Sequence, residues 1–322
     1  MMPRPRYSCL CLIVCLLGAI HCVGANPALA ADQLTQGTNS KKTRKQAIAA
    51  IPYNQLTTET RAKVSAVVDK PSIYRRLPVT SIDVDPDMFL FLVRYPEVVV
   101  NIWQIMGVTR MTVQRDGPFS LKSNDGVGAV SDVDLIYGTN NKNIYYAEGT
   151  YEGPLLKRKL RGSAVIILQT NYERSPNGQP KTTNSLDVFV KVENATASLI
   201  AKTLNPIVGP TADHNFVESL KFVQRLNETT EQNGVGVQRM ANRLKNIEDD
   251  VRQNFIRVAG MVYERSNQSA RKTTQPPQRT GARPSKNTSS FIPSAANQKI
   301  RLIPFSYPDS KAIRRASFND LR

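Results

Sequence analysis

Cysteine is missing from this 322-residue chain beyond its first 22 positions, and histidine is nearly missing too. The four cysteines all lie in an apolar N-terminal stretch, and the only histidine beyond position 30 is His214. A chain without these side chains forms no disulfide or thiolate metal site and has few of the usual nucleophiles and general bases. The composition therefore argues against most enzyme classes, and we predict no catalytic residue.

The N-terminus has the three parts of a secretory signal peptide. Arg4 and Arg6 precede an apolar run, and the small residues of an A-x-A cleavage site end at Ala30. We expect cleavage near Ala30 to remove residues 1–30, so that the mature protein is exported to the periplasm or the cell exterior. An uncleaved anchor is the alternative, because the run approaches the roughly 18–20 residues that cross a bilayer.

The two ends of the mature chain are poor in apolar residues. Residues 31–50 are polar and basic, and we expect a flexible segment there. Residues 266–322 combine many prolines and serines with a large excess of basic over acidic side chains. Such a tail buries too little apolar surface to offset its ordering entropy, so we predict disorder. Its charge suits an anionic membrane surface or a cell-wall polymer, whereas it has no motif for binding nucleic acid.

Residues 51–232 carry the pattern of a folded domain. A helix is predicted from Thr57 to Val68, and a strand over residues 73–83 is interrupted by Pro78. Asp85 before Pro86 has the pattern of a helix start, with Asp85 as N-cap. A second short helix is predicted to begin at Pro96 and end at Gly107, and Thr211 is predicted to cap a long final helix. Strand-like runs separated by turn residues lie between them: 108–114, 117–123, 126–137, 143–151, 160–172 and 185–192.

This order of elements resembles the helix-grip fold of the START-like and polyketide-cyclase-like superfamily, over residues 73–227. The resemblance rests on the order alone and on no signature motif, and that superfamily has no invariant catalytic residue to carry over. It implies an α+β fold in which an antiparallel sheet of about seven strands wraps a long C-terminal helix. It also implies an apolar cavity that binds a hydrophobic small molecule or lipid, which is a functional analogy drawn from fold.

Aromatic side chains are spread over the elements that would surround such a cavity. Tyrosines among them would give the cavity polar groups, as ligand pockets tend to have. A packed core would use the same residues, and the sequence does not separate a cavity from a core. The candidates are Phe89, Trp103, Phe119, Tyr137, Tyr146, Tyr151, Phe189 and Phe216.

Charged and acidic clusters give weaker predictions. Lys157, Arg158, Lys159 and Arg161 could bind an anionic group or could protect a sheet edge from pairing. Alternating aspartates near positions 85 and 132 lack the glycine and distal glutamate of a calcium loop, so we predict no metal and no cofactor. His214 is expected to be an exposed residue in the first turn of a helix.

Residues 233–265 are predicted to form one amphipathic heptad helix. Apolar residues recur at alternating spacings of three and four, with Asn254 as the one polar member. This seam either pairs two chains into a homodimer or docks along the domain. Its members are Val237, Met240, Leu244, Ile247, Val251, Asn254, Val258 and Met261.

Three functions remain open at this point. The first is an exported, non-enzymatic protein that binds a hydrophobic or lipid-like molecule in a helix-grip cavity. The second is a cell-envelope interaction protein that uses the heptad helix and the basic tail. The third is an enzyme with Asp, Glu or Tyr chemistry around His214.

Overall fold

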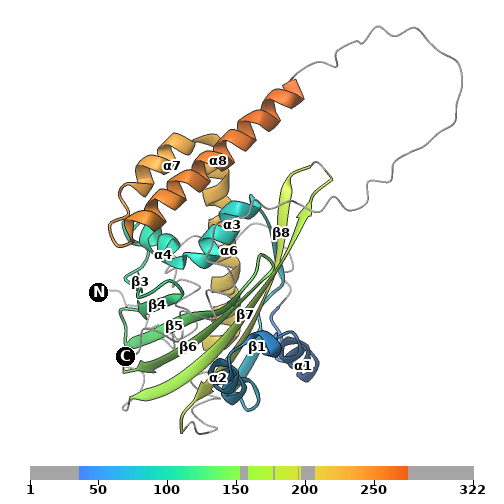
Figure 1. Cartoon of the computed structure of the whole chain (residues 1–322), viewed down its shortest axis with the longest axis vertical. Coiled ribbons are helices and arrows are strands. Elements are labelled where there is room, and N and C mark those ends of the chain that lie inside the picture. Colours follow the sequence, from blue (N-terminus) through green and yellow to red (C-terminus); the bar gives the residue numbers. More distant parts are fainter. Residues whose placement is uncertain (1–35, 153–158, 177, 195, 197–206, 275–322) are drawn as a thin grey trace, which may run out of the picture.

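The structure, a computed structural model, describes residues 36–152, 159–176, 178–194, 196 and 207–274 (Figure 1). Its centre is one antiparallel sheet with the strand order β1-β8-β7-β6-β5-β4-β3, and β2 also pairs with β8. The strands are β1 Ile73–Arg76, β2 Thr80–Asp83, β3 Thr112–Arg115, β4 Ser120–Asn124, β5 Ala129–Gly138, β6 Lys142–Tyr151, β7 Leu160–Arg174 and β8 Pro180–Val192.

Helices cover both faces of this sheet, with α6 behind it and α1 and α2 in front of it in Figure 1. Helices α3 and α4 lie at one end of the sheet, and α7 and α8 pack beside them and α6. The helices are α1 Lys41–Ala49, α2 Thr58–Val68, α3 Pro86–Arg94, α4 Pro96–Ile105, α6 Ala212–Gln232, α7 Gly234–Ala241 and α8 Asp249–Thr274, with short helical turns at Tyr53–Gln55 and Ile207–Thr211.

The expected resemblance to helix-grip proteins is confirmed at the level of the fold. A curved antiparallel sheet packs against the long helix α6, and two short helices connect β2 to β3. The sheet has eight strands because the run interrupted at Pro78 forms two strands, β1 and β2, that pair with successive parts of β8. A proline cannot donate a ladder hydrogen bond, which explains the break at that position.

The start of the short helices follows the predicted signals. The Asp85 carboxylate accepts hydrogen bonds from the backbone N–H of Asp87 and Met88, and Pro86 takes the first helical position of α3. Pro96 begins α4, and the residue before a proline avoids the helical region, so the chain turns by 87° between α3 and α4. No single helix in the described ranges is long and apolar enough to cross a bilayer; α3 and α4 reach that length only as this bent pair.

Side chains from the two faces of the sheet form two separate hydrophobic clusters. The main cluster lies on the side of α3, α4, α6, α7 and α8, and it includes Tyr145 and Ile166. The second lies under α1 and α2, and it includes Tyr146, Val165 and Phe189. Successive residues of a strand point to opposite faces, so neighbours in β6 and β7 belong to different clusters.

The prediction of a flexible segment over residues 31–50 is wrong from Lys41 onward, because Lys41–Ala49 forms α1. Ser40 caps this helix by accepting from the Thr43 backbone N–H, and Ala47 is fully buried in the second cluster. The expectation that Thr211 caps the long helix is also wrong. Thr211 has helical angles and makes no capping hydrogen bond, because the turn at Ile207–Thr211 already leads into α6.

The prediction of one continuous heptad helix over residues 233–265 is likewise wrong. The disorder predicted for the tail is also wrong for residues 266–274, because α8 continues to Thr274. The chain forms α7 and α8, which are separated after Ala241 and pack against each other. The apolar seam residues pack into the main cluster of the same chain, whereas Asn254 accepts a hydrogen bond from Arg257. Phe255, which follows Asn254 in the sequence, is fully buried. Its ring stacks on Phe91 of α3, with the ring centroids 5.8 Å apart. The described seam residues therefore dock along their own domain, which is one of the two roles expected for the seam.

Candidate functional site

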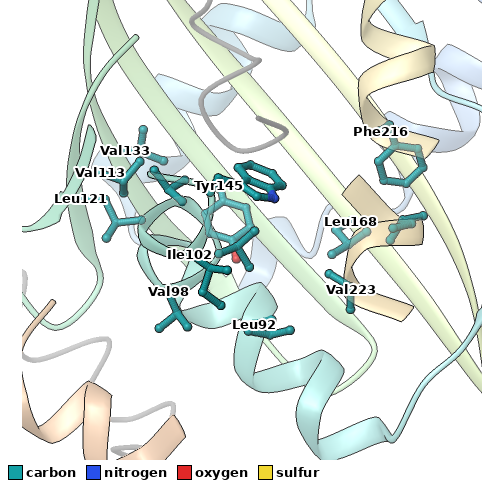
Figure 2. Packing of buried hydrophobic residues seen from close by; sticks show 14 of the residues in the cluster. Leu92, Val98, Ile102, Val113, Leu121, Val133, Tyr145, Leu168, Phe216 and Val223 are labelled. Atoms are coloured by element: carbon teal, nitrogen blue, oxygen red, sulfur yellow. The ribbon is translucent and has the colours of Figure 1, made fainter. Parts of the chain in front are cut away.

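A partly enclosed cavity of about 100 Å³ lies between α6, the α3–α4 pair and the inner face of β6, β7 and β8. In Figure 2, Leu92 and Tyr145 lie on one side of this space, and Phe216, Leu168 and Val223 lie on the other. Beyond Tyr145, side chains of α4 and of β3 to β5 pack in the main cluster (Figure 2). The lining residues are Phe89, Leu92, Val93, Pro96, Val99, Val100, Trp103, Tyr145, Ile166, Leu168, Leu186, Phe216, Ser219, Leu220 and Val223.

The period of each element explains why these residues meet. Phe216, Leu220 and Val223 lie on one face of α6, at spacings of four and three residues. In β7, Ile166 and Leu168 are two residues apart and share the inner face. The α3–α4 bend then closes one end of the space with aliphatic side chains.

Almost all of the cavity wall is apolar. Among the described lining residues, only Trp103, Tyr145 and Ser219 carry polar side-chain atoms, and none has a carboxylate, an imidazole, an amine or a guanidinium. The Tyr145 hydroxyl donates a hydrogen bond of 2.6 Å to the carbonyl of Val93. The wall can therefore remove an apolar group from water, and it offers few groups to an ionic one.

Three of the predicted cavity residues line it: Phe89, Trp103 and Phe216. Tyr151 is fully buried and Phe119 partly buried in the main cluster, but neither reaches the cavity.

The prediction that the other three residues line the cavity is wrong. They lie in or against the second cluster, on the opposite face of the sheet: Tyr137, Tyr146 and Phe189. Phe189 packs there against Tyr74, with ring centroids 4.8 Å apart.

Tyr145 and the aliphatic lining residues were missed from the sequence. The signal for Tyr145 was present: it stands six residues from Tyr151, so both share a face of β6, whereas Tyr146 stands five residues away and points to the other face. Tyr146 and Tyr151 could therefore never line the same cavity. No comparable signal marks Leu92 or Val99, because both sit in helices buried on most sides.

The predicted anion-binding cluster is not brought together with the cavity. Lys157 and Arg158 lie outside the described residues. Lys159 and Arg161 are exposed, and the Lys159 ammonium is 3.9 Å from a carboxylate oxygen of Glu152. This geometry is that of a weak surface pair.

His214 is exposed in the first turn of α6, as expected, and its neighbour Asp213 is fully engaged elsewhere. Both carboxylate oxygens of Asp213 accept from the Arg75 guanidinium, at 2.7 and 2.5 Å, and one also accepts from the Gly37 N–H. Asp213 is therefore occupied with joining α6 to β1 and to the N-terminal segment. Across the ranges that the structure describes, no cluster of His, Cys, Asp or Glu could hold a metal ion.

Two ionic clusters lie near the cavity without lining it. The Glu97 carboxylate of α4 is almost fully buried and accepts from Arg115 at 2.7 Å, and its burial raises the pKa of Glu97. Arg265 of α8 donates to Asp85 at 2.8 Å and to Asp87 at 2.6 Å, at the start of α3. Burial raises the pKa of Asp87, and the ion pair with Arg265 opposes that rise. Both clusters hold elements of the cavity wall in place.

A second hollow of about 570 Å³ is more open and polar, and it is lined by the ends of strands β5 to β8 and the turn between β5 and β6. Its one cationic group, the Lys142 ammonium, donates to the Ala50 carbonyl at 2.7 Å. The hollow therefore has neither an apolar wall nor an uncommitted charge among its lining residues.

No protein-family model matches this chain, and a comparison with curated proteins finds no match. Among solved structures, the chain is similar to an uncharacterized protein from Rhizobium leguminosarum, with 15% identity over 46% of this chain and 95% of that one, and a TM-score of 0.28. A truncated norcoclaurine synthase from Thalictrum flavum is similar at 10% identity over 46% and 91%, with a TM-score of 0.30. Ara h 8.0201 is similar at 11% identity over 47% and 97%, with a TM-score of 0.29. At these identities the likeness concerns the fold alone.

Proposed function

We propose that this protein binds a small apolar molecule in the cavity between α6 and the sheet. The cavity itself is the observation that carries the proposal. Native cores are close-packed and contain few voids larger than a water molecule. At about 24 cal/mol per Å³, leaving a void of about 100 Å³ empty costs roughly 2 kcal/mol of stability. A bound apolar molecule would recover that free energy and explain why the side chains leave the space open.

The volume limits what the ligand can be. Pockets for drug-sized molecules are roughly 300–1,000 Å³, several times larger than this cavity of about 100 Å³. The occupant is therefore a small molecule or the end of a longer one, such as the tip of an acyl chain. A complete lipid does not fit in this volume.

Binding without catalysis is the function that the lining residues support. General acid–base chemistry needs a titratable group within hydrogen-bond reach of the substrate. The one titratable side chain among the described lining residues is Tyr145, whose hydroxyl donates its proton to the Val93 carbonyl. The exposed position of His214 supports the same proposal over an enzyme built around that residue.

A filled-cavity variant tests this function. Trp103 is the only tryptophan of the chain and lines the cavity, so its fluorescence reports directly on occupancy. Titration with a small apolar probe, such as a cyclohexane derivative, should change the Trp103 emission of the wild-type protein until binding saturates. Val223→Phe should abolish the change, because the added ring occupies the space. Val130→Phe, at a position 51% exposed on β5, is the matched control and should bind normally. Equal binding by all three proteins would overturn the proposal.

We further propose that the protein acts outside the cytoplasm and that its basic tail holds it near an anionic surface. Both ideas rest on the sequence, because residues 1–35 and 275–322 lie outside the described part of the chain. Mass spectrometry of the purified mature protein should find an N-terminus at Ala31. Sedimentation with vesicles that contain anionic lipid should decrease as salt is raised, and it should be lost when residues 275–322 are deleted.

A further inference from the structure

The single tryptophan of the cavity wall carries an unused hydrogen-bond donor. Trp103 is only 2% exposed, and its indole N–H has no hydrogen-bond partner in the described structure. The indole packs edge-on against Phe222 of α6, with ring centroids 5.4 Å apart. Because buried polar groups are nearly always paired in native proteins, a buried unpaired donor can accept a partner from outside the chain, which is either a water molecule or a ligand.

The groups around the cavity do not supply that acceptor. The rest of the lining is apolar except for Tyr145 and Ser219. The hydroxyl of Tyr145 is directed to the Val93 carbonyl at 2.6 Å, toward the α3–α4 bend. Trp103 therefore lines the apolar cavity and carries an indole N–H that has no partner among the described residues.

We infer that the ligand of this cavity is an apolar molecule with one neutral acceptor, such as a ketone, ester or ether oxygen, which accepts a hydrogen bond from the Trp103 indole N–H. This inference rests on the proposed binding function and specifies its ligand class. A carboxylate or phosphate does not fit, because none of the described residues that line the cavity is cationic and could pair with a buried charge. A pure hydrocarbon would fill the space and leave the donor unpaired.

A pair of isosteric probes separates these cases. Cyclohexanone and methylenecyclohexane have similar shapes, and they differ in whether an oxygen or a methylene group projects from the ring. Calorimetric titration gives the ratio of their dissociation constants. The preference for the ketone, expressed as this ratio, should be roughly two- to tenfold larger in the wild-type protein than in Trp103→Phe. That is the range expected for one net hydrogen bond. Phe222→Leu alters the packing of the indole but keeps its N–H, so this control variant should retain the wild-type preference.

The indole N–H also gives a direct spectroscopic readout. A protein labelled with ¹⁵N at tryptophan shows one indole N–H resonance, because the chain has one tryptophan. Cyclohexanone should shift this proton resonance downfield, as a new hydrogen bond does, whereas methylenecyclohexane should not produce a downfield shift.

The outcomes are distinguishable. If both probes bind the wild-type protein with the same ratio as Trp103→Phe, and the indole resonance does not move downfield with the ketone, the inference is wrong and the proposed apolar binding stands. If neither probe binds the wild-type protein at any accessible concentration, the proposed function fails and the inference fails with it. A ketone preference that Trp103→Phe loses and Phe222→Leu keeps supports both.

Discussion

Glu97 and Arg115 form a buried ion pair beside the cavity wall. The carboxylate of Glu97 is 1% exposed, and Arg115 also donates to the carbonyls of Arg94 and Pro118, each at 3.1 Å. The Arg115 guanidinium lies 4.9 Å from the centre of the Tyr95 ring. Breaking a buried pair by removing one partner is costly, because the other charge is left without compensation.

We therefore predict that Arg115→Met destabilises the protein by about 3–5 kcal/mol at neutral pH. Burial holds the pKa of Glu97 above its ordinary value of 4.5, and Arg115 opposes that rise. Loss of Arg115 raises the pKa of Glu97 further. A carboxyl with a raised folded-state pKa contributes stability that is fully present below pH 4.5 and is lost as the pH rises through the folded pKa. Urea unfolding at pH 5 and pH 8 should show the larger loss at pH 8.

An exposed pair supplies the control for this prediction. Lys122→Met removes the partner of Asp116 at a surface site and should leave the free energy of unfolding nearly unchanged at both pH values. The double variant Glu97→Leu with Arg115→Met should regain much of the lost stability, since no buried charge remains. A loss for Arg115→Met that is equal at both pH values would mean that the Glu97 charge is not its cause.

Individual residues of the site could be predicted only where the period of their element was known. Trp103 and Phe216 sit on helices whose apolar faces are visible in the sequence, and both line the cavity. Tyr146 and Phe189 sit on strands that are buried on both faces, so hydrophobicity alone gives no inner side. Once one residue of a strand, such as Tyr151 of β6, is known to lie on the inner face, every second residue of that strand is placed on the same face.

At the scale of elements, α8 shows what a spacing pattern can and cannot predict. The residues of the expected seam are apolar for the expected reason, since Val251 and Val258 face the main cluster. The pattern did not reveal the break before α8, where Asp249 and Asp250 supply the negative charges that favour the first turn of a new helix. Spacing identifies the buried face, whereas partner and continuity depend on contacts with distant elements.

Arg265 fastens α8 to the start of α3, and we predict that its removal loosens this attachment. The guanidinium is 37% exposed while Asp85 and Asp87 are nearly buried, so the pair lies between surface and core cases. Arg265→Ala should destabilise the protein by about 1–2 kcal/mol and increase hydrogen exchange in α8 near residue 265.

Arg239→Ala, at an exposed position of α7, is the matched control for Arg265→Ala and should leave both stability and exchange unchanged. If Arg265→Ala leaves exchange in α8 at the wild-type rate, the attachment depends on the apolar contacts of Phe255 and Val262 alone.

At the scale of the whole molecule, the sheet lies between two hydrophobic layers. The inner layer with α6 was anticipated from the order of elements. The outer layer was not, because α1 came from a segment whose basic composition predicted flexibility. Its helix is held by tertiary contacts: Ala47 is buried, and the Arg44 guanidinium donates to the carbonyls of Val68 and Asp69. Packing on a distant sheet face overrides weak local propensity.

The outer layer gives the last prediction, which concerns residues 36–71. Deleting them removes α1 and α2 and uncovers side chains that are now fully buried on β6, β7 and β8, including Ile144, Val165 and Phe189. A contiguous apolar patch on a sheet face promotes aggregation. We expect this truncated protein to be insoluble or to elute as large assemblies in size-exclusion chromatography. The control lacks residues 275–322, predicted from sequence to be disordered, and should elute as the full chain does. A soluble, compact protein without residues 36–71 would show that the inner layer alone sustains the fold.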